Sequence, residues 1–336
     1  MNLLTKFFYY LIVLISLVVI VLSLLSLSYN NTLWWMKAMD FPRLQYLVIA
    51  FACLIIFGLR NPKWTFWPVF LMIGLLATVV IQGSFIFPYT PMTPPKVASV
   101  APDKVDASER VSLLLANVYM HNREADALLD VVQQTDPDML LLMETDRWWI
   151  DQVGPLRERY AHRHELPIDN TYGMALYSRY PLQDFTTMFL QHDSVPSFHC
   201  DVQLPNGRSF RFHGVHPVPP VHSKHPDNAG QKEKELVLVG NLVEEDALPE
   251  MVAGDFNDVA WSNTSRLFEA SGELEDTRIG RGMYNSFDAQ SWIMRWPLDH
   301  VYVSEEFRVV SFRRLGKFGS DHFPILVELA LLDARE

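Results

Sequence analysis

Residues 251–258 read MVAGDFND, and residues 320–326 read SDHFPIL. The first stretch is a short apolar run that ends in a cluster of polar side chains. The second places two polar side chains in a loop between two further apolar runs. Short apolar runs with such boundaries are typical of buried strands. The polar residues concerned are Asp255, Asn257, Asp321 and His322.

The same pattern recurs elsewhere in the second half of the chain, where polar residues stand at the ends of predicted strands. They are Asn117, Glu144, His216, and Asp299 with His300. Each alone has an ordinary explanation, since Asn117 could cap a turn and Glu144 could pair with Arg147. Together they match a particular chemistry. Mg²⁺ takes carboxylate and amide oxygens as ligands, and phosphoester hydrolysis needs an oriented water and donors to the phosphate oxygens.

The order of apolar runs between 110 and 330 predicts an α/β fold. Strands are expected at 111–116, 139–143, 173–178, 198–204, 209–215, 251–253, 301–303, 309–315 and 323–329. Helices are expected at 123–134, 229–245 and 262–270, because apolar residues recur there at helical spacing. The pair Asn206-Gly207 predicts a hairpin turn. Mixed strands with a few covering helices indicate an α/β sandwich.

Three long apolar runs occupy the first quarter of the chain: 7–27, 46–59 (extendable back to Phe41) and 64–87. A bilayer core needs about 20 apolar residues of helix, which the first and third runs provide. The first run is longer than the apolar part of a cleaved signal peptide, so an uncleaved helix is favoured. We expect residues 1–87 to form a membrane anchor of about three transmembrane helices. The cations Arg60 and Lys63 in a tight connection predict that it faces the cytoplasm and that the later domain lies outside.

Residues 88–109 are rich in proline and are expected to form a semi-rigid linker to a domain over 110–336. Of the 28 Lys and Arg residues, six precede Ala101, and of the 39 acidic residues only Asp40 does, so the remainder carries a net charge of −16. Domains that bind nucleic acid through phosphates are normally basic. The charge therefore disfavours bulk nucleic acid as a partner. The cysteines, Cys53 and Cys200, cannot form a disulfide within the domain.

Seven ordered segments give the chain a specific resemblance. They are LLLANV (113–118), LLLMET (140–145), GMALYSRYP (173–181), GVHPVPP (214–220), GDFND (254–258), PLDHVYV (297–303) and SDHFPIL (320–326). In sequence and order they resemble the endonuclease/exonuclease/phosphatase superfamily, which includes exonuclease III and DNase I. The resemblance covers residues 110–330. It implies a four-layer α/β sandwich, with two mixed sheets flanked by helices, and a metal-dependent hydrolase of phosphoester bonds.

The resemblance also implies roles for individual residues. Glu144 would be the principal ligand of Mg²⁺ (Mn²⁺ or Ca²⁺ being possible alternatives), with Asn117 and Asp321 completing or supporting the metal site. Asp255 would orient or deprotonate the attacking water, and Asn257 would hold a phosphate oxygen. His322, paired with Asp299, would act as a base or bind the phosphate, and His216 would lie opposite as acid or transition-state stabiliser. Asn117, Asn257 and His216 are thus also the expected substrate-binding residues, and the division of labour between the histidines stays open.

Some segments depart from the family pattern, and others allow more than one interpretation. Ser286-Phe287 replaces a common Thr-Trp, and PLDHV differs from the pattern of inositol-polyphosphate phosphatases, which disfavours that substrate class. The insertion 217–228, with His222 and His225, is expected to be a solvated loop, with a substrate-facing lid as the alternative. Trp148-Trp149 could either pack internally or contact substrate or membrane. Candidate cations for a nucleic-acid groove are Arg123, Arg179, Arg278, Arg281, Arg295 and Lys317.

These observations predict a multi-pass enzyme of a bacterial inner membrane with an extracytoplasmic (periplasmic) catalytic domain. Its partners would be the lipid bilayer and a phosphoester substrate, either a lipid headgroup or a small phosphoester. One alternative is an extracytoplasmic nuclease. Another is an inactive membrane-bound scaffold, which the retention of every expected site residue disfavours.

Overall fold

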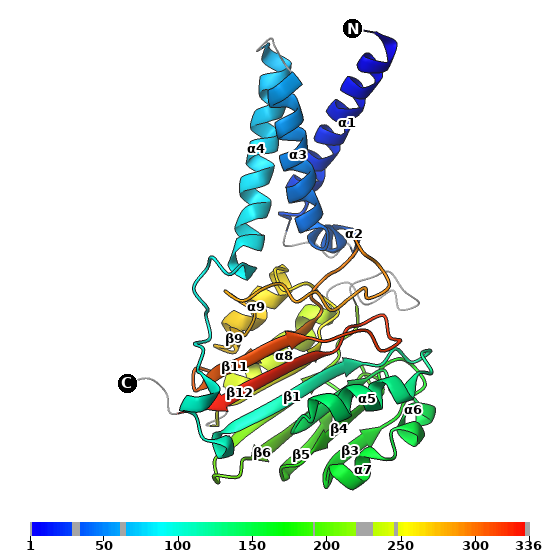
Figure 1. Ribbon diagram of the computed structural model, residues 1–336, viewed down its shortest axis with the longest axis vertical. Coiled ribbons are helices and arrows are strands. Elements are labelled where there is room, and N and C mark those ends of the chain that lie inside the picture. The colour runs from blue at the N-terminus through cyan, green and yellow to red at the C-terminus, as the bar shows by residue number, and fades with distance from the viewer. Residues whose placement is uncertain are drawn as a thin grey trace.

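A stalk of helices stands on a body built from two β-sheets (Figure 1). The computed structural model describes residues 2–28, 34–60, 65–190, 192–219, 231–244 and 248–332. The stalk contains α1 (Leu3–Leu25), α3 (Arg43–Arg60) and α4 (Phe66–Ile86), with the short α2 (Trp34–Lys37) and η1 (Ala38–Asp40) at its base. From Pro220 on, the insertion at 217–228 lies outside the described residues. Residues 61–63, which belong to the connection whose cations predict the membrane orientation, also lie outside them.

Each sheet of the body has six strands. The first has the order β11-β12-β1-β2-β4-β3, and the second the order β5-β6-β7-β8-β10-β9. The strands of the first sheet are β1 (Arg110–Asn117), β2 (Met139–Met143), β3 (His162–Leu166), β4 (Met174–Ser178), β11 (Phe307–Arg314) and β12 (Ile325–Leu331). Those of the second are β5 (Leu182–Met188), β6 (Ser197–Gln203), β7 (Ser209–Val215), β8 (Glu250–Asp255), β9 (Glu275–Asp276) and β10 (Asp299–Val303). Both are mixed, because β1–β2 and β7–β8 pair parallel and the other pairs are antiparallel.

Alternation of side chains along β1 explains the layers. Successive residues of a strand point to opposite faces. Leu113 and Leu115 face the second sheet, in a core shared with residues such as Phe198 and Phe212. Leu114 faces the other way, into a cluster under α5 (Ala125–Thr135), α6 (Arg147–Gln152) and α7 (Leu156–Arg159). A third cluster lies between the second sheet and α8 (Gln231–Glu244) with α9 (Asn263–Ser271). The four-layer α/β sandwich is confirmed.

The strands that sequence reasoning missed are at sheet edges. Both β3 and β5 end their sheets, and neither has a fully buried residue. Such strands lack the continuous apolar run by which a central strand such as β2 is recognised. Edge strands commonly carry polar side chains, which discourage pairing with another chain.

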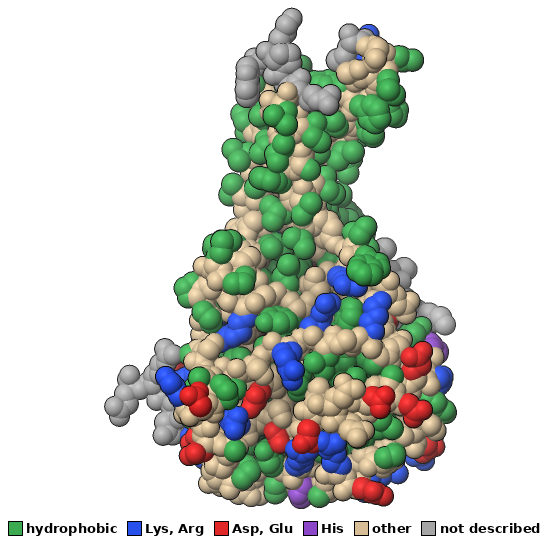
Figure 2. Space-filling model, viewed as in Figure 1, with side chains coloured by type: hydrophobic (Ala, Val, Ile, Leu, Met, Phe, Trp, Pro, Cys, Tyr) green, Lys and Arg blue, Asp and Glu red, His purple; other side chains and the backbone are tan. Residues whose placement is uncertain are grey.

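Two stalk helices are long and apolar enough to cross a membrane, Leu3–Leu25 and the segment Phe66–Tyr89, and Arg43–Leu59 is a shorter apolar helix. The three helices pack on one another around Tyr46, Ala50, Phe57 and Leu75. Their outer surface is apolar, as Figure 2 shows by the hydrophobic side chains that cover the stalk. An exposed apolar surface of this extent is typical of contact with lipid.

A buried arginine ties the stalk helices together at their base. Arg43, fully buried, donates to the Ser26 carbonyl oxygen at 2.8 Å and to Gln82 Oε1 at 3.0 Å, and pairs with Asp40. Gln82 in turn donates to Ser23 Oγ at 2.8 Å. Residues from α1, α3 and α4 are therefore joined in one polar network, which satisfies a buried charge that would otherwise be costly.

The proline-rich segment differs from the expected spacer, because it packs against the body. The Tyr89 hydroxyl donates to the Ala260 carbonyl oxygen at 2.9 Å, and Val97 is buried in the core between the sheets. Further along, the Val100 amide donates to the Val309 carbonyl oxygen at 3.0 Å. The prolines thus form an extended strap that holds the stalk close to the body.

Three contacts join the base of the stalk directly to the body. Trp261 Nε1 donates to the Asp40 carbonyl oxygen at 2.8 Å, and Gln45 Nε2 donates to the Ile293 carbonyl oxygen at 2.9 Å. The rings of Phe41 and Trp296 meet edge to face, with centroids 5.5 Å apart. The body is therefore held in one orientation beneath the helices.

The Arg43 network predicts the effect of a substitution. Arg43→Met removes the charge and leaves the polar groups around it buried without partners, so it should destabilise the full chain by about 3 kcal/mol. Thermal unfolding in detergent measures this, with the exposed Lys6→Met as matched control. An Arg43→Met protein as stable as the control would show that the network does not hold the stalk together.

Candidate active site

The register of the second sheet brings two acids face to face. In the antiparallel pair β8–β10, Asp255 lies directly opposite Asp299. Side chains opposite one another in such a pair are close neighbours. Both are almost completely buried, so two carboxylates meet at one end of the sheet with little access to water.

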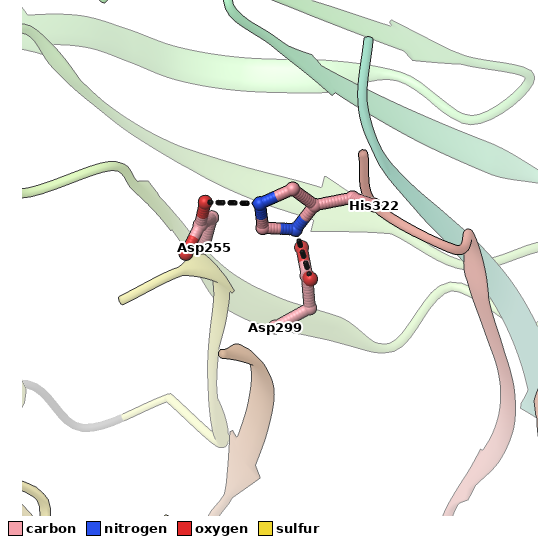
Figure 3. Close-up of side chains that lie close together, drawn as sticks. All are labelled: Asp255, Asp299 and His322. Carbon is pink, nitrogen blue, oxygen red and sulfur yellow. Dashed lines mark hydrogen bonds and ion pairs between the residues drawn. The ribbon is translucent and has the colours of Figure 1, made fainter. Parts of the chain in front are cut away.

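A histidine from the first sheet lies between these acids. His322, in the loop before β12, is 2.8 Å from Asp299 Oδ2 through Nδ1 and 3.5 Å from Asp255 Oδ2 through Nε2 (Figure 3). Its ring is buried, so both nitrogens are engaged by carboxylates in a site of low polarity. The three residues come from both sheets, and their contact joins the two sheets at this edge.

The charge of His322 follows from its surroundings. Burial alone would lower the pKa of the imidazole, but the negative charges of Asp299 and then Asp255, with the hydrogen bond to Asp299, raise the pKa to about 10. The two carboxylates therefore favour the protonated form of the ring. An imidazolium held in place by one carboxylate is a suitable donor to an anionic phosphate oxygen.

Glu144 lies beside this group and is held by two donors. Asn117 Nδ2 donates to Glu144 Oε1 at 2.9 Å and to Asp255 Oδ2 at 3.0 Å, and the Met120 amide donates to Glu144 Oε2 at 3.2 Å. The Asn117 Oδ1 atom accepts from the Tyr119 amide at 2.9 Å. In this orientation the Asn117 nitrogen faces the two carboxylates and fixes their positions. Glu144 has a φ of 61°, a left-handed conformation uncommon for a glutamate and often found at functional sites.

Asp321 completes a group of acids whose repulsion a cation would relieve. Burial raises the pKa of Asp321, and although His322 opposes this, the charges of Glu144 and Asp255 contribute to a value of about 6. Asp321 and Glu144 line the same cavity. Carboxylate oxygens are the ligands that Mg²⁺ prefers, so the donor set fits a hard divalent cation.

By position alone, a metal ion could also be assigned to Asp255, Asp299 and His322, whose ligand atoms lie within 4.8 Å of one another. Both ring nitrogens of His322 already face carboxylates, Nδ1 at 2.8 Å from Asp299 and Nε2 at 3.5 Å from Asp255, which suits a hydrogen-bonded group of side chains. These three residues form a hydrogen-bonded relay, and Glu144 with Asp321 beside it are the residues that the sequence predicted to hold a metal ion.

His216 and Asn257 border the same carboxylate. His216 Nε2 is 3.8 Å from Asp255 Oδ2, and its Nδ1 is buried without a hydrogen-bond partner among the described residues. The backbone amide of Asn257 donates to Asp255 Oδ1 at 2.7 Å, and the side-chain Nδ2 of Asn257 donates to the Pro217 carbonyl oxygen at 3.0 Å. All eight sequence-predicted site residues thus gather at one edge of the sandwich. His300, in contrast, points into a separate buried network.

Two serines that were not among the predicted site residues support the relay. Ser286 Oγ accepts from the Leu298 amide at 3.2 Å and from the Asp299 amide at 3.1 Å. Ser320 Oγ donates to the Asn117 carbonyl oxygen at 2.8 Å and accepts from the His322 amide at 3.0 Å. The signals in the sequence were the serine that departs from the family pattern at 286 and the serine that opens SDHFP.

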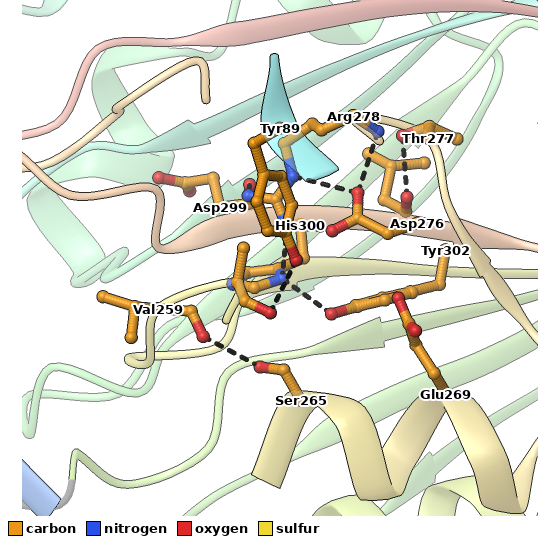
Figure 4. Close-up of polar contacts among 12 residues, drawn as sticks. Tyr89, Val259, Ser265, Glu269, Asp276, Thr277, Arg278, Asp299, His300 and Tyr302 are labelled. Carbon is orange, nitrogen blue, oxygen red and sulfur yellow. Dashed lines mark hydrogen bonds and ion pairs between the residues drawn. The ribbon is translucent and has the colours of Figure 1, made fainter. Parts of the chain in front are cut away.

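A second buried network holds the backbone of Asp299 (Figure 4). Arg278 is fully buried and forms two hydrogen bonds to the Asp276 carboxylate, at 3.0 Å and 2.8 Å. It also donates to the Asp299 carbonyl oxygen at 3.2 Å and to His300 Nδ1 at 2.6 Å. Arg278, a candidate groove cation in the sequence, is therefore a positioning residue behind the relay.

The site opens into a cavity of about 540 Å³ between the body and the stalk. One wall carries Glu144, Asn257, Asp321 and His322. Another part of the wall is formed by the base of the stalk, through Ala38, Phe41 and Pro42. The remaining wall residues are apolar: Pro219, Phe287, Met294, Trp296 and Leu298. The cavity therefore joins a charged catalytic side to an apolar side that belongs to the helical stalk.

The tryptophan pair after Glu144 has an internal role. Trp149 is completely buried under the first sheet, and Trp148 stacks with Arg123, whose Cζ lies 4.5 Å from its ring centroid. Arg123 also pairs with Asp146 at 2.9 Å. Trp149 therefore packs internally, whereas Trp148 is half-buried and its contact with a substrate or a membrane stays a prediction.

Comparison with known proteins defines the class. The model of the endonuclease/exonuclease/phosphatase family matches residues 114–322, which is more than half of the chain. The chain belongs to this family, whose members are metal-dependent phosphodiesterases and nucleases. The comparison with curated proteins found no match.

Solved structures share the fold at low identity. The human Nocturnin catalytic domain with bound sulfate is similar to it at 18% identity, covering 68% of this chain and 96% of that one, with a TM-score of 0.52. D. rerio TDP2 complexed with a single-strand DNA product has 14% identity, coverage of 67% and 99%, and a TM-score of 0.51. A Beutenbergia cavernae family protein has 17% identity, coverage of 67% and 72%, and a TM-score of 0.52.

The contrast between two arginines tests the second buried network. Arg278→Met leaves the buried Asp276 carboxylate unpaired and should destabilise the protein by about 3–5 kcal/mol. Arg157→Met removes a partly exposed pair with Glu165 and should cost no more than about 1 kcal/mol. Chemical unfolding of both variants measures the difference. Equal losses would contradict a structural role for the Arg278 network.

Proposed function

We propose that this protein is a membrane-anchored, Mg²⁺-dependent phosphoesterase whose substrate is the phosphoester of a lipid headgroup. The observation that carries the proposal is the cavity itself. Its catalytic wall belongs to the phosphoesterase body, and another part of its wall is the base of a stalk with two helices long enough to cross a membrane. A phosphate bound at the catalytic wall would have apolar groups beside it, just as the phosphate of a lipid headgroup lies beside the apolar part of the lipid.

The residues of the chain divide the chemistry among them. Asp255, fixed by Asn117, is placed to accept a proton from the attacking water. The His322 imidazolium, held by Asp299, donates to a phosphate oxygen. His216 acts on the leaving oxygen, as acid or transition-state stabiliser. Asn257 donates to a second phosphate oxygen. A metal ion held by Glu144 and Asp321 would neutralise charge on the phosphate.

The anchor and its sidedness are part of the proposal. We infer a multi-pass protein of a plasma membrane, with the middle helix completing the bundle and the catalytic body on the extracytoplasmic side. The support is the packing of the three helices and the cations Arg60 and Lys63 in the connection between α3 and α4. The bilayer is then both the location and the source of substrate.

The hydrolysis assay uses the full chain in detergent with bis-p-nitrophenyl phosphate and Mg²⁺ or Mn²⁺. Wild-type protein should release p-nitrophenolate, and chelation of the metal with EDTA should abolish the release. Asp255→Ala and His322→Ala should each lower kcat by about 10²–10⁴-fold, the usual contribution of a positioned acid or base. Asp126→Ala on α5 and His162→Ala on β3 are the matched controls and should behave as wild type.

Substrate class is tested with the same proteins on phospholipids, nucleotides and single- and double-stranded DNA. Phospholipid should be hydrolysed best when the chain is in a bilayer. Preference for DNA would favour the nuclease alternative over the lipid proposal. If wild type and the Asp255→Ala/His322→Ala double variant behaved alike on every substrate, the enzyme proposal would fail.

A further inference from the structure

The loop between Phe287 and Trp296 exposes three consecutive large apolar side chains. Trp292 is 87% exposed, Ile293 75% and Met294 47%. Burying a side chain of this size is normally favourable by about 1.5–3 kcal/mol, so three adjacent exposed ones call for a partner. Nothing in the described part of the chain covers them.

This loop lies at the level where the stalk meets the body. Figure 1 shows it in orange, reaching toward the base of the helices beside α2. Its backbone is fixed there, because Gln45 in the first turn of α3 donates to the Ile293 carbonyl oxygen at 2.9 Å. If α1 and α4 cross a bilayer, the exposed side chains of the loop stand at the height of its surface. Tryptophan is enriched at this depth in membrane proteins.

Two arginines lie near the apolar side chains: Arg295 follows them directly, and Arg314 ends β11. Each donates to a backbone carbonyl oxygen, Arg295 to that of Ser291 at 2.6 Å and Arg314 to that of Asn285 at 3.0 Å. Arg295 and Arg314 lie against the Phe323 ring, with their Cζ atoms 5.0 Å and 4.1 Å from its centroid. Arg295 also lies 5.4 Å from the Trp292 ring centroid. Neither arginine forms an ion pair with an acid among the described residues. Figure 2 shows Lys and Arg side chains gathered on the body just below the stalk, with Asp and Glu farther from it.

Both features adjoin the catalytic cavity. Phe323 follows His322 directly, and Phe287, at the start of the loop, has its ring centroid 5.0 Å from that of His322. Met294 lines the cavity while remaining half exposed. An anion held by the two arginines would therefore lie beside the mouth of the site.

We propose that this loop and arginine pair form a binding site for an acidic phospholipid of the bilayer. Trp292 and Ile293 enter the boundary between headgroups and acyl chains, and Arg295 with Arg314 binds the lipid phosphate. The inference rests on the proposed function in that it names the class of lipid presented to the catalytic cavity. Two guanidinium groups whose charges no acid balances among the described residues favour an anionic headgroup over a zwitterionic one, because each basic residue near an anionic bilayer surface strengthens binding.

The depth of the loop is measured with a nitroxide label on Trp292→Cys in the full chain, reconstituted in nanodiscs that contain phosphatidylglycerol. Cys53 and Cys200 are buried and should stay unlabelled, which the reaction of wild-type protein checks. The label should collide with oxygen more than with a water-soluble nickel complex, at a depth of about 5–10 Å below the headgroups. A label on Asn206→Cys is the aqueous control. Asn206 lies in the turn before β7, whereas His216 follows the other end of that strand. A label at 292 as open to the nickel complex as the control overturns the proposal.

The arginine pair is tested by native mass spectrometry of the full chain with phosphatidylglycerol. The Arg295→Gln/Arg314→Gln protein should bind this lipid about 30-fold more weakly than wild type, a factor of about five for each charge. Arg163→Gln/Lys104→Gln removes two exposed cations elsewhere on the body and should retain wild-type affinity. Equal affinity in wild type and both double variants would contradict the site.

Neither readout depends on hydrolysis, so the two proposals fail separately. Lipid binding and loop insertion without hydrolysis of any phosphoester would reject the proposed function and keep this site. Metal-dependent hydrolysis with the 292 label in water would reject the site and keep the enzyme.

Discussion

The buried contact of His322 with Asp299 and Asp255 is the constraint on which the catalytic edge of the molecule depends. The three side chains come from different sheets and exclude water, so the charge of the imidazolium must be balanced by carboxylates held at 2.8 Å and 3.5 Å. That balance depends on the register of β8 against β10, which places the two acids opposite one another, and on the path of the loop before β12. The buried Arg278 network and the hydroxyls of Ser286 and Ser320 follow from the same need, because each holds a backbone segment that presents one member of the relay.

The placement of the stalk fixes the orientation of this edge of the body relative to the helices. A flexible spacer would let the body turn freely, whereas the strap through Tyr89 and Val97 and the contact of Trp261 with the Asp40 carbonyl hold it in one orientation. As a result, Phe41 and Pro42 form part of the cavity wall, and the stalk contributes to the surroundings of the site. The acidic character of the body matters less for the proposed lipid substrate, because cations gather near the base of the stalk on the face seen in Figure 2.

Much of the fold and of the site could be predicted from the sequence, and the exceptions have physical causes. Central strands such as β1 and β2 are buried on both faces, so their apolar runs are unmistakable, and the polar residues that end them identify the catalytic edge. The edge strands β3 and β5 lack such runs. The packing of the proline-rich strap depends on long-range contacts, such as Val100 with Val309, which no local pattern reveals. The burial of Arg278 also depends on a long-range arrangement, because its sequence position suggests a surface cation and only the structure shows its hydrogen bonds to Asp276. The part of the cavity wall that the stalk supplies is likewise invisible in the sequence.

The central claim is that the catalytic cavity opens toward bilayer lipid, and photo-crosslinking from within the cavity tests it most directly. Met294 would be replaced by p-benzoylphenylalanine in the full chain, in a bilayer of defined phospholipid, and the irradiated protein analysed by mass spectrometry. Because Met294 lines the cavity and is half exposed, the account predicts a covalent adduct whose mass is that of one phospholipid. Adducts confined to the protein itself, with no lipid attached, would contradict it.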